Sequence, residues 1–177
     1  MPNYIRATNP GATYFFTVAL ADRSSRLLVD RIDTLRSAFR SERQKHPFSI
    51  DAIVVLPDHL HCLWTLPPDD ADFPNRWRRI KAAFSHALPK TEPRSESRLK
   101  QGERGIWQRR YWEHLIRDER DHAAHVDYIH FNPVKHGHVT QVMDWPHSSF
   151  HRFVREGVLS GDWGGSGNLE WVVGERD

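Results

Sequence analysis

Two histidines separated by one residue stand in HLHCLWTL, residues 59–66, which otherwise has the apolar and aromatic character of a buried strand. Side chains at positions i and i+2 of a strand project to the same side, so His59 and His61 are expected to point together. Imidazoles placed in this way can bind one metal ion, with Leu60 between them facing the opposite side. Two ordinary polar histidines are the alternative in a chain that contains 12, so the neighbouring residues must decide.

A metal site needs further ligands. A structural zinc site normally has four, often with cysteine, but the single cysteine of the chain, Cys62, would point away from His61. A catalytic site needs only a third protein ligand and open positions for water or a substrate oxygen. The candidates for this ligand are Asn132, Glu113, His114 and His130. Glu113 could instead orient a histidine ligand, and each of the two histidines is as readily a structural polar residue.

A candidate nucleophile lies in HVDYIHFNPVKHG, where Tyr128 and Asn132 stand four residues apart and so share a helical face. If that face meets the histidine pair, Asn132 can complete the metal site while Tyr128 presents its hydroxyl. A phenol with a pKa of about 10 attacks poorly unless a cation helps it. Both residues could equally be structural, because Pro133 disfavours helical geometry at Asn132. Tyr111 is a rival nucleophile, although its aromatic neighbours favour packing.

The elements that must position these residues follow from periodicity and turn signals. Strands are predicted at residues 13–20, 48–57, 59–66 and 106–118. Helices are predicted from Asp30 to about Lys45, with Asp30 or Asp33 as cap, and at 73–88 and 119–137, with Asp118 capping the last. The order β-α-β-β-α-β-α predicts a ferredoxin-like (RRM-like) α+β fold. Its antiparallel sheet would carry helices on one face, an extra catalytic helix and a C-terminal tail.

The 177 residues are expected to form one domain. Residues 89–105 are polar and lack periodicity, which predicts a mobile loop, and the tail from about 151 to 177 is expected to wrap over the domain. The stretch MPNYIRATNPGATYFF lacks the basic and apolar blocks expected of a signal peptide, and no apolar run approaches the roughly 18 to 20 residues that cross a bilayer. With a single cysteine, these features predict a cytoplasmic protein without a membrane partner.

Charge is distributed unevenly along the chain. The formal net charge is +2, yet residues 76–110 contain 11 lysines and arginines against 3 glutamates, a net +8. Such a concentration is typical of a nucleic-acid surface, although a solvated basic surface without a ligand has the same composition. The candidates for DNA contact are Arg76, Arg79, Arg109, Arg110 and Lys135. The last three flank the proposed site in sequence.

Taken together, these residues resemble the HUH single-tyrosine transposases, in which U is a bulky apolar residue, and specifically their REP-associated branch. The resemblance covers nearly the whole chain. It is carried by VVLPDHLHCLWTLP, FPNRWRRIKAAF, IWQRRYWEH, HVDYIHFNPVKHG and DWPHSSFHR.

The resemblance implies cleavage and rejoining of single-stranded DNA at repetitive extragenic palindromes, which fold as hairpins. It implies that His59, His61 and Asn132 bind Mg²⁺ or Mn²⁺ and that Tyr128 forms a 5′-phosphotyrosine link. It further implies a monomer associated with the nucleoid. Two alternatives share parts of this chemistry: a non-catalytic repressor or repeat-binding protein on the same fold, and a rolling-circle initiator or relaxase, which normally needs additional domains.

Overall fold

Alternation of large apolar residues with smaller or polar ones builds a four-stranded antiparallel sheet in the order β2-β3-β1-β4. The structure is a computed structural model that describes residues 9–165. The strands are β1 (Thr13–Ala19), β2 (Ser49–Val55), β3 (His59–Thr65) and β4 (Trp112–Leu115). This order, with crossover helices after the first and third strands, is the ferredoxin-like arrangement, so the predicted fold class is confirmed.

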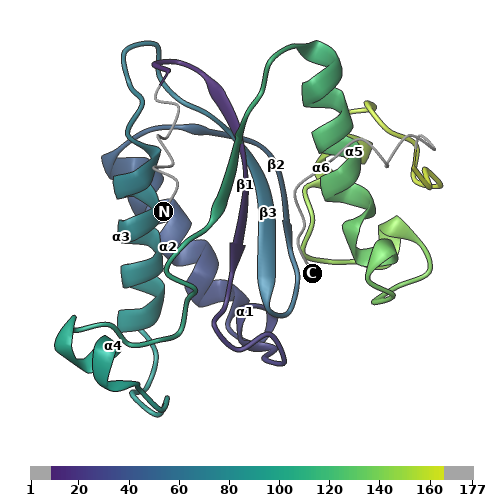
Figure 1. The fold of residues 1–177 in the computed structure, drawn as a ribbon. Coiled ribbons are helices and arrows are strands. Elements are labelled where there is room, and N and C mark those ends of the chain that lie inside the picture. Colours follow the sequence, from purple (N-terminus) through teal and green to yellow (C-terminus); the bar gives the residue numbers. More distant parts are fainter. Residues whose placement is uncertain (1–8, 166–177) are drawn as a thin grey trace.

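The helices lie on both faces of this sheet. They are α1 (Leu27–Asp30), α2 (Ile32–Lys45), α3 (Phe73–His86), α4 (Glu96–Lys100), α5 (Glu119–Lys135), the 3-10 helix η1 (Val142–Asp144) and α6 (Phe150–Arg155). In Figure 1, α2 and α3 lie on one side of the strands, and α5 and α6 on the other. The ferredoxin-like unit supplies the first layer, and the added C-terminal helices cover the face that this unit leaves open.

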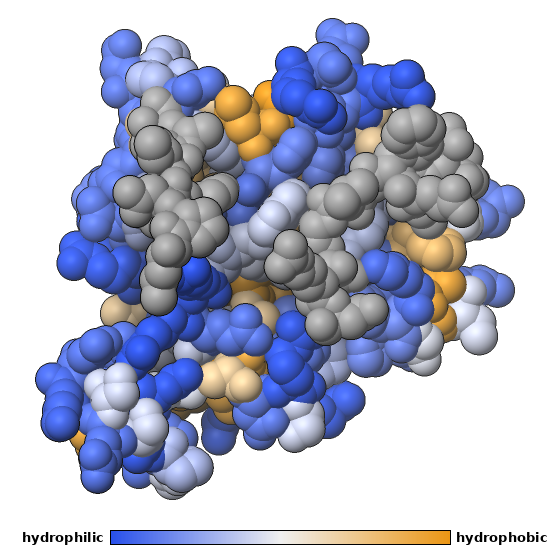
Figure 2. All heavy atoms as spheres, in the orientation of Figure 1, coloured by the Kyte–Doolittle hydropathy of each residue, from blue (hydrophilic) through white to orange (hydrophobic). Residues whose placement is uncertain are grey.

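Each face of the sheet has its own apolar core, because successive strand residues point to opposite sides. Tyr14, Phe16 and Trp64 belong to the larger core under α2 and α3. Phe15 and Leu63 belong to a smaller core under α5. Among the described residues, the exposed large hydrophobic side chains are those of Leu99 and Val158. Figure 2 accordingly shows a mostly hydrophilic face on which apolar atoms form small separate groups.

The helix expected from Asp30 to about Lys45 begins differently from its prediction. The segment is broken at Arg31, which ends α1 and precedes α2, and neither Asp30 nor Asp33 caps α2. By contrast, the predicted cap of α5 has a side-chain hydrogen bond, because Asp118 accepts from the Asp121 amide. Asp72 caps α3 in the same way by accepting from the Asn75 amide.

α3 presents a stripe of apolar residues, at steps of three and four along the helix, to the larger core. Its members are Phe73, Trp77, Ile80, Phe84 and, just beyond the helix, Leu88. The strand predicted at 106–118 is shorter than expected. Pairing begins at an isolated bridge between Leu20 and Trp107, stops over the exposed arginines that follow, and resumes at β4.

The segment 89–105 contains structure that its composition did not indicate. Ser95 caps α4 by accepting from the Arg98 amide. Arg104 forms an ion pair with Glu92 and donates to the carbonyls of Leu88 and Pro89, which ties the segment to the end of α3. One arginine therefore organises a stretch that lacks apolar periodicity.

The chain after α5 completes the edge of the sheet. Ser148 forms a bridge with Val54, the Val55 amide donates to the His147 carbonyl, and the Ser149 amide donates to the Ile53 carbonyl. The part of the predicted tail at 166–177 lies outside the described residues. Within residues 9–165, no helix has the length and apolarity that spanning a membrane requires.

Candidate active site

The α5 side of β3 carries both histidines of the pair. Their ring centroids are 5.0 Å apart, the ring planes are close to perpendicular at 83°, and both side chains are buried. Leu60 and Cys62 belong to the opposite core, as their alternation with the histidines requires. The predicted common direction of His59 and His61 is therefore confirmed, and Cys62 does not face them.

Each imidazole is held through its Nδ1 atom. His59 Nδ1 lies 2.9 Å from Asp58 Oδ1, and Arg23 donates to the other oxygen of that carboxylate at 2.6 Å. Burial raises the pKa of Asp58, but its contacts with His59 and Arg23 outweigh this effect and hold the pKa at about 2. His61 Nδ1 lies 2.9 Å from Thr17 Oγ1 on β1. These contacts orient both rings with Nε2 as the nitrogen that would bind a metal ion.

Tyr128 lies on the α5 face that packs over these strands. Its ring makes an edge contact with the ring of His61 at a centroid distance of 5.2 Å, and another with Phe15 at 6.0 Å. The Tyr128 side chain is 4% exposed. Lys135 donates to its hydroxyl oxygen at 3.3 Å. The phenol is thus on the same side of the sheet as the histidine pair, which is the arrangement that the enzyme hypothesis requires.

Asn132 stands one helical turn after Tyr128 and is completely buried. Neither Oδ1 nor Nδ2 of its amide has a hydrogen-bond partner among residues 9–165. Leaving a buried polar group without a partner costs about 1–3 kcal/mol, so such an amide commonly serves a ligand. With two imidazole nitrogens on the adjoining strand, an amide oxygen gives a donor set that suits Mn²⁺ and, less comfortably, Mg²⁺.

The C-terminal end of α5 keeps this amide in the helix despite the proline that follows it. The helix continues through Pro133 to Lys135. Gly137, two residues beyond the helix, has a φ of +71°, and its amide donates to the Val134 carbonyl while the His138 amide donates to the Pro133 carbonyl. This is a Schellman end, which favours glycine at its left-handed position. The unwinding at Asn132 that Pro133 could cause does not occur.

Three contributors to the site were missed from the sequence: Asp58, Thr17 and His136. The ring centroid of His136 lies 5.2 Å from that of His59, beyond the end of α5. Asp58 directly precedes the first histidine, which was a usable signal. Thr17 could be found only through the strand pairing, in which it faces His61.

The other proposed third ligands lie elsewhere. Glu113 pairs with Phe16 across β1 and β4 and so faces the larger core, where it cannot orient the histidines. His130 Nε2 is 2.9 Å from Ser149 Oγ, and its ring packs against Phe153 of α6. Burial, with smaller contributions from nearby positive groups, lowers the pKa of His130 to about 4.

His114 belongs to a second cluster, with Asp121 and His125, whose ligand atoms lie within 4.8 Å of one another and could hold a metal ion. Asp121 is 2.9 Å from His114 Nε2 and 3.1 Å from His125 Nδ1, and it accepts from the Arg117 amide. Burial raises the pKa of Asp121, but its contacts with His114 and Arg117 outweigh this effect and set the pKa at about 2. The three side chains already contact one another through the Asp121 carboxylate, and these contacts connect β4 to the start of α5.

The five residues predicted to contact DNA have different surroundings. Lys135 is at the site, and Arg110 is exposed just before β4. Arg109 is exposed and pairs with Glu103. Arg79 donates to buried Glu42 and lies in the α2–α3 layer, across the sheet from the histidines.

Arg76 is 2% exposed and forms a bidentate ion pair with the carboxylate of Asp70. It also donates to the carbonyls of His46 and Pro47. A side chain committed in this way has no donor facing solvent. The structure therefore places Arg76 in the protein interior, and Arg79 in an ion pair with Glu42 away from the histidine side of the sheet.

Comparison with known proteins matches this architecture. The family model described as "Transposase IS200 like" matches residues 11–132, which include both histidines, Tyr128 and Asn132. A REP-associated tyrosine transposase of Escherichia coli is 47% identical over 176 residues, covering 99% of this chain and 98% of that protein. A relative from Haemophilus influenzae is 47% identical over 171 residues, covering 96% and 97% of the two chains.

The fold has a similar counterpart among solved structures. A REP-associated tyrosine transposase bound to a REP hairpin aligns with a TM-score of 0.86 at 47% identity, covering 100% of this chain and 99% of the other. The similarity therefore extends over sequence and structure alike, across the full length of both proteins. The chain belongs to the REP-associated tyrosine transposases, within the IS200-like transposase family.

Proposed function

We propose that this protein is a metal-dependent endonuclease and strand transferase that acts on single-stranded DNA at REP hairpins. The relative whose structure contains a REP hairpin supports this substrate. The observations that carry the catalytic proposal are the contact between Tyr128 and His61 and, one helical turn further along α5, the buried, unsatisfied amide of Asn132. A packed structural tyrosine would not need a histidine pair and an amide of this kind around it.

In the proposed reaction Tyr128 is the nucleophile. Its hydroxyl oxygen attacks the scissile phosphorus, forming the Oη–P bond while the bond from phosphorus to the 3′-oxygen breaks. The phenolic proton passes to solvent, and the departing 3′-oxygen takes up a proton to become a hydroxyl group. The product is a 5′-phosphotyrosine link whose reversal, with a different 3′-hydroxyl as attacking group, rejoins a strand.

The surrounding residues orient and stabilise this nucleophile. Lys135 places a positive charge beside the Tyr128 oxygen, which favours its deprotonated form. Asp58 and Thr17 fix the two imidazoles. A Mg²⁺ or Mn²⁺ ion bound by His59, His61 and Asn132 would polarise the phosphate and neutralise developing charge. All of these residues come from one chain, which supports a monomer as the active species. We further propose that this monomer acts at the nucleoid in the cytoplasm.

The experiment that tests this proposal is a search for the covalent adduct. A REP hairpin oligonucleotide with a single-stranded 5′ extension is incubated with the protein and Mn²⁺, and the products are separated on a denaturing gel. We expect a protein band shifted by attached DNA, absent when EDTA is added. Tyr128→Phe should remove the band, whereas the matched variant Tyr111→Phe, altered in the opposite core, should retain it.

The same experiment separates the enzyme from a non-catalytic hairpin-binding protein on this fold. Such a protein would retard the hairpin on a native gel and give no adduct under denaturing conditions. An adduct of undiminished intensity in Tyr128→Phe would instead assign the nucleophile to another residue. Either result would overturn the catalytic role given to Tyr128.

A further inference from the structure

The cluster of His114, Asp121 and His125 brings potential metal ligands together from two elements. His114 belongs to β4, whereas Asp121 and His125 stand four residues apart in the first two turns of α5. Residues with this spacing share a helical face, so the carboxylate and the second imidazole both point toward β4. The Asp121 carboxylate is the centre of the group, because it lies 2.9 Å from His114 Nε2 and 3.1 Å from His125 Nδ1.

The spacing of these atoms is close to what a metal ion requires. Zn²⁺ binds imidazole nitrogens and carboxylate oxygens at about 2.0–2.2 Å in tetrahedral geometry, so two of its ligand atoms lie about 3.4 Å apart. Both distances to Asp121 are shorter than this value by a few tenths of an ångström. A small outward movement of the imidazoles would therefore admit an ion in place of the protons that now join them to the carboxylate.

The charge of the cluster suits a divalent cation. Asp121, with its pKa of about 2, is ionised at neutral pH, and burial lowers the pKa of His125, which keeps that imidazole neutral and able to coordinate. The Arg117 guanidinium lies 3.3 Å from the carboxylate, but its side chain is exposed and can turn to solvent. The Arg117 backbone amide donates to the same carboxylate at 3.0 Å, and such outer hydrogen bonds commonly orient metal ligands.

Aromatic rings surround the two imidazoles. The rings of His114 and His125 stack on each other at a centroid distance of 4.8 Å. The ring of Trp112 stacks on His114 at 5.7 Å, and that of Phe15 lies 4.7 Å from His125. An apolar surrounding of this kind limits the access of water to a metal site. The His114 side chain is 25% exposed, so an ion and a water ligand can enter from its side.

The cluster is separate from the proposed catalytic ion. In the sheet, β1 lies between β3, which carries His61, and β4, which carries His114. Phe15 of β1 stands at this position, and its ring contacts both His125 and His61, at 4.7 and 5.6 Å. The two sets of ligands therefore lie on the same side of the sheet but have no residue in common. Two imidazoles with an ionised carboxylate also favour Zn²⁺ over Mg²⁺.

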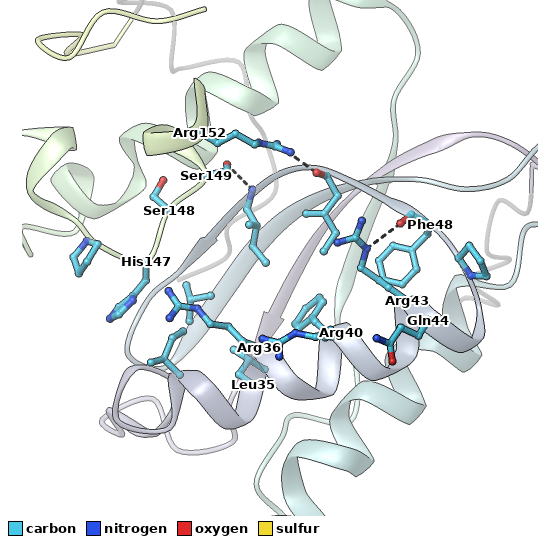
Figure 3. A pocket seen from close by; sticks show the side chains of 17 residues that line it. Leu35, Arg36, Arg40, Arg43, Gln44, Phe48, His147, Ser148, Ser149 and Arg152 are labelled. Carbon is cyan, nitrogen blue, oxygen red and sulfur yellow. Dashed lines mark hydrogen bonds between the residues drawn. The ribbon is translucent and has the colours of Figure 1, made fainter. Parts of the chain in front are cut away.

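The cluster attaches the start of the helix that carries Tyr128. Beyond the other end of α5, the chain is attached to β2: Ser149 Oγ accepts from the Ile53 amide at 2.9 Å, and Arg152 donates to the Ile50 carbonyl at 3.4 Å. Figure 3 shows Ser149 and Arg152 reaching from this segment toward the strand. Because β2 and β4 are the two edge strands, α5 and its continuation are attached to opposite edges of the sheet.

We propose that His114, Asp121 and His125 bind one Zn²⁺ ion, with water in the remaining position, and that this ion joins β4 to α5. The inference adds a second metal site and does not depend on the proposed function. Three protein ligands and a water make an open site, in contrast to the four protein ligands of a closed structural zinc site. The ion would therefore be exchangeable and would stabilise the fold according to the free zinc concentration.

The first test counts zinc ions per chain by equilibrium dialysis of the full-length protein against low micromolar Zn²⁺. The parent protein is compared with His114→Ala and with the matched control His122→Ala, which alters a partly exposed histidine of α5 outside the cluster. We expect the parent and the control to bind one ion more than His114→Ala. Zinc at about 100 times its dissociation constant should raise the melting temperature of the parent and the control by about 5 °C, and that of His114→Ala by less.

Equal zinc content in the parent and His114→Ala would overturn the inference, because the zinc would then be held elsewhere, for example by His59 and His61. A second measurement uses the parent alone, so it does not depend on how the variant folds. In crystals soaked with Zn²⁺ and measured at the zinc absorption edge, we expect an anomalous peak between His114 and His125. No peak there overturns the inference, and so does a peak without the difference in dialysis, which marks an adventitious ion only. The proposed function is judged separately, by adduct formation at Tyr128 with Mn²⁺.

Discussion

The ammonium nitrogen of Lys135 lies 3.3 Å from the hydroxyl oxygen of Tyr128 and 4.9 Å from the centre of its ring. Seven residues, or two helical turns, separate them on α5, so the helix itself fixes this approach. From the sequence Lys135 was a candidate phosphate contact. Its position beside the phenol oxygen instead favours a direct effect on the nucleophile.

Replacing Lys135 should therefore affect the chemical step. We expect Lys135→Met to lower the rate of adduct formation at saturating DNA by about 100-fold, the magnitude typical for loss of one stabilising donor in an active site. Lys135→Arg should recover part of the rate, because it keeps a positive charge. The measurement is single-turnover cleavage over a range of hairpin concentrations. A variant that binds hairpin weakly but cleaves at the normal maximal rate would show that Lys135 serves DNA binding alone.

Asp58 should act through His59, one of the proposed metal ligands. In Asp58→Asn the hydrogen bond to His59 Nδ1 loses its charge, and Arg23 loses its ion pair. Loss of such an outer partner typically weakens metal binding about 10- to 100-fold. The Mn²⁺ concentration for half-maximal cleavage should rise by that factor, with a nearly normal rate at saturating Mn²⁺. Asp69→Asn, an exposed change, is the control. An unchanged metal requirement would remove Asp58 from the site.

The parts of the fold that were predictable are those specified by local periodicity. Alternation in HLHCLWTL placed the two histidines on one side of β3, and the four-residue spacing placed Tyr128 and Asn132 on one face of α5. These two predictions agree with the structure because strand and helix geometry fix the direction of a side chain without reference to the rest of the chain. That the two faces meet depended on the resemblance to a known family.

What the sequence did not reveal depends on long-range pairing. Thr17 supports His61 only because β1 and β3 are in a particular register. Arg76 and Arg110 belong to the same basic stretch, yet one is buried against Asp70 and the other exposed. A charge count cannot separate them, since the partner that neutralises an arginine need not be close in sequence. The hydrogen bond from Arg104 to the Leu88 carbonyl was hidden for the same reason.

The contrast between buried Arg76 and exposed Arg110 gives a direct test. Arg76→Ala should lower the free energy of unfolding by about 2–3 kcal/mol, because it breaks a buried pair and leaves backbone carbonyls without donors. Its effect on hairpin affinity, measured well below the unfolding temperature, should be small. Arg110→Ala should do the reverse, weakening hairpin binding without a change in stability. Urea titration and fluorescence anisotropy measure the two quantities. If Arg76→Ala were fully stable and bound DNA weakly, its assignment to the protein interior would be incorrect.

Acid should destabilise the protein through His130, which is buried between α5 and α6. The unfolded chain protonates this imidazole below about pH 6.5, whereas burial lowers its pKa in the folded protein to about 4. Between these values the unfolded state binds more protons, so stability falls as the pH decreases. From pH 7 to pH 5 this residue alone should remove about 2 kcal/mol from the free energy of unfolding.

His130→Gln removes the titrating group while keeping a side chain that can bond Ser149. We expect the variant to be somewhat less stable than the parent at pH 7 but to lose less stability on acidification, so the two urea-unfolding curves converge toward pH 5. The exposed change His86→Gln should leave the parent's pH dependence intact. Parallel losses in the parent and in His130→Gln would mean that other groups cause the acid sensitivity. Convergence would establish that the α5–α6 contact, on the helix that carries Tyr128, is held together by a neutral imidazole.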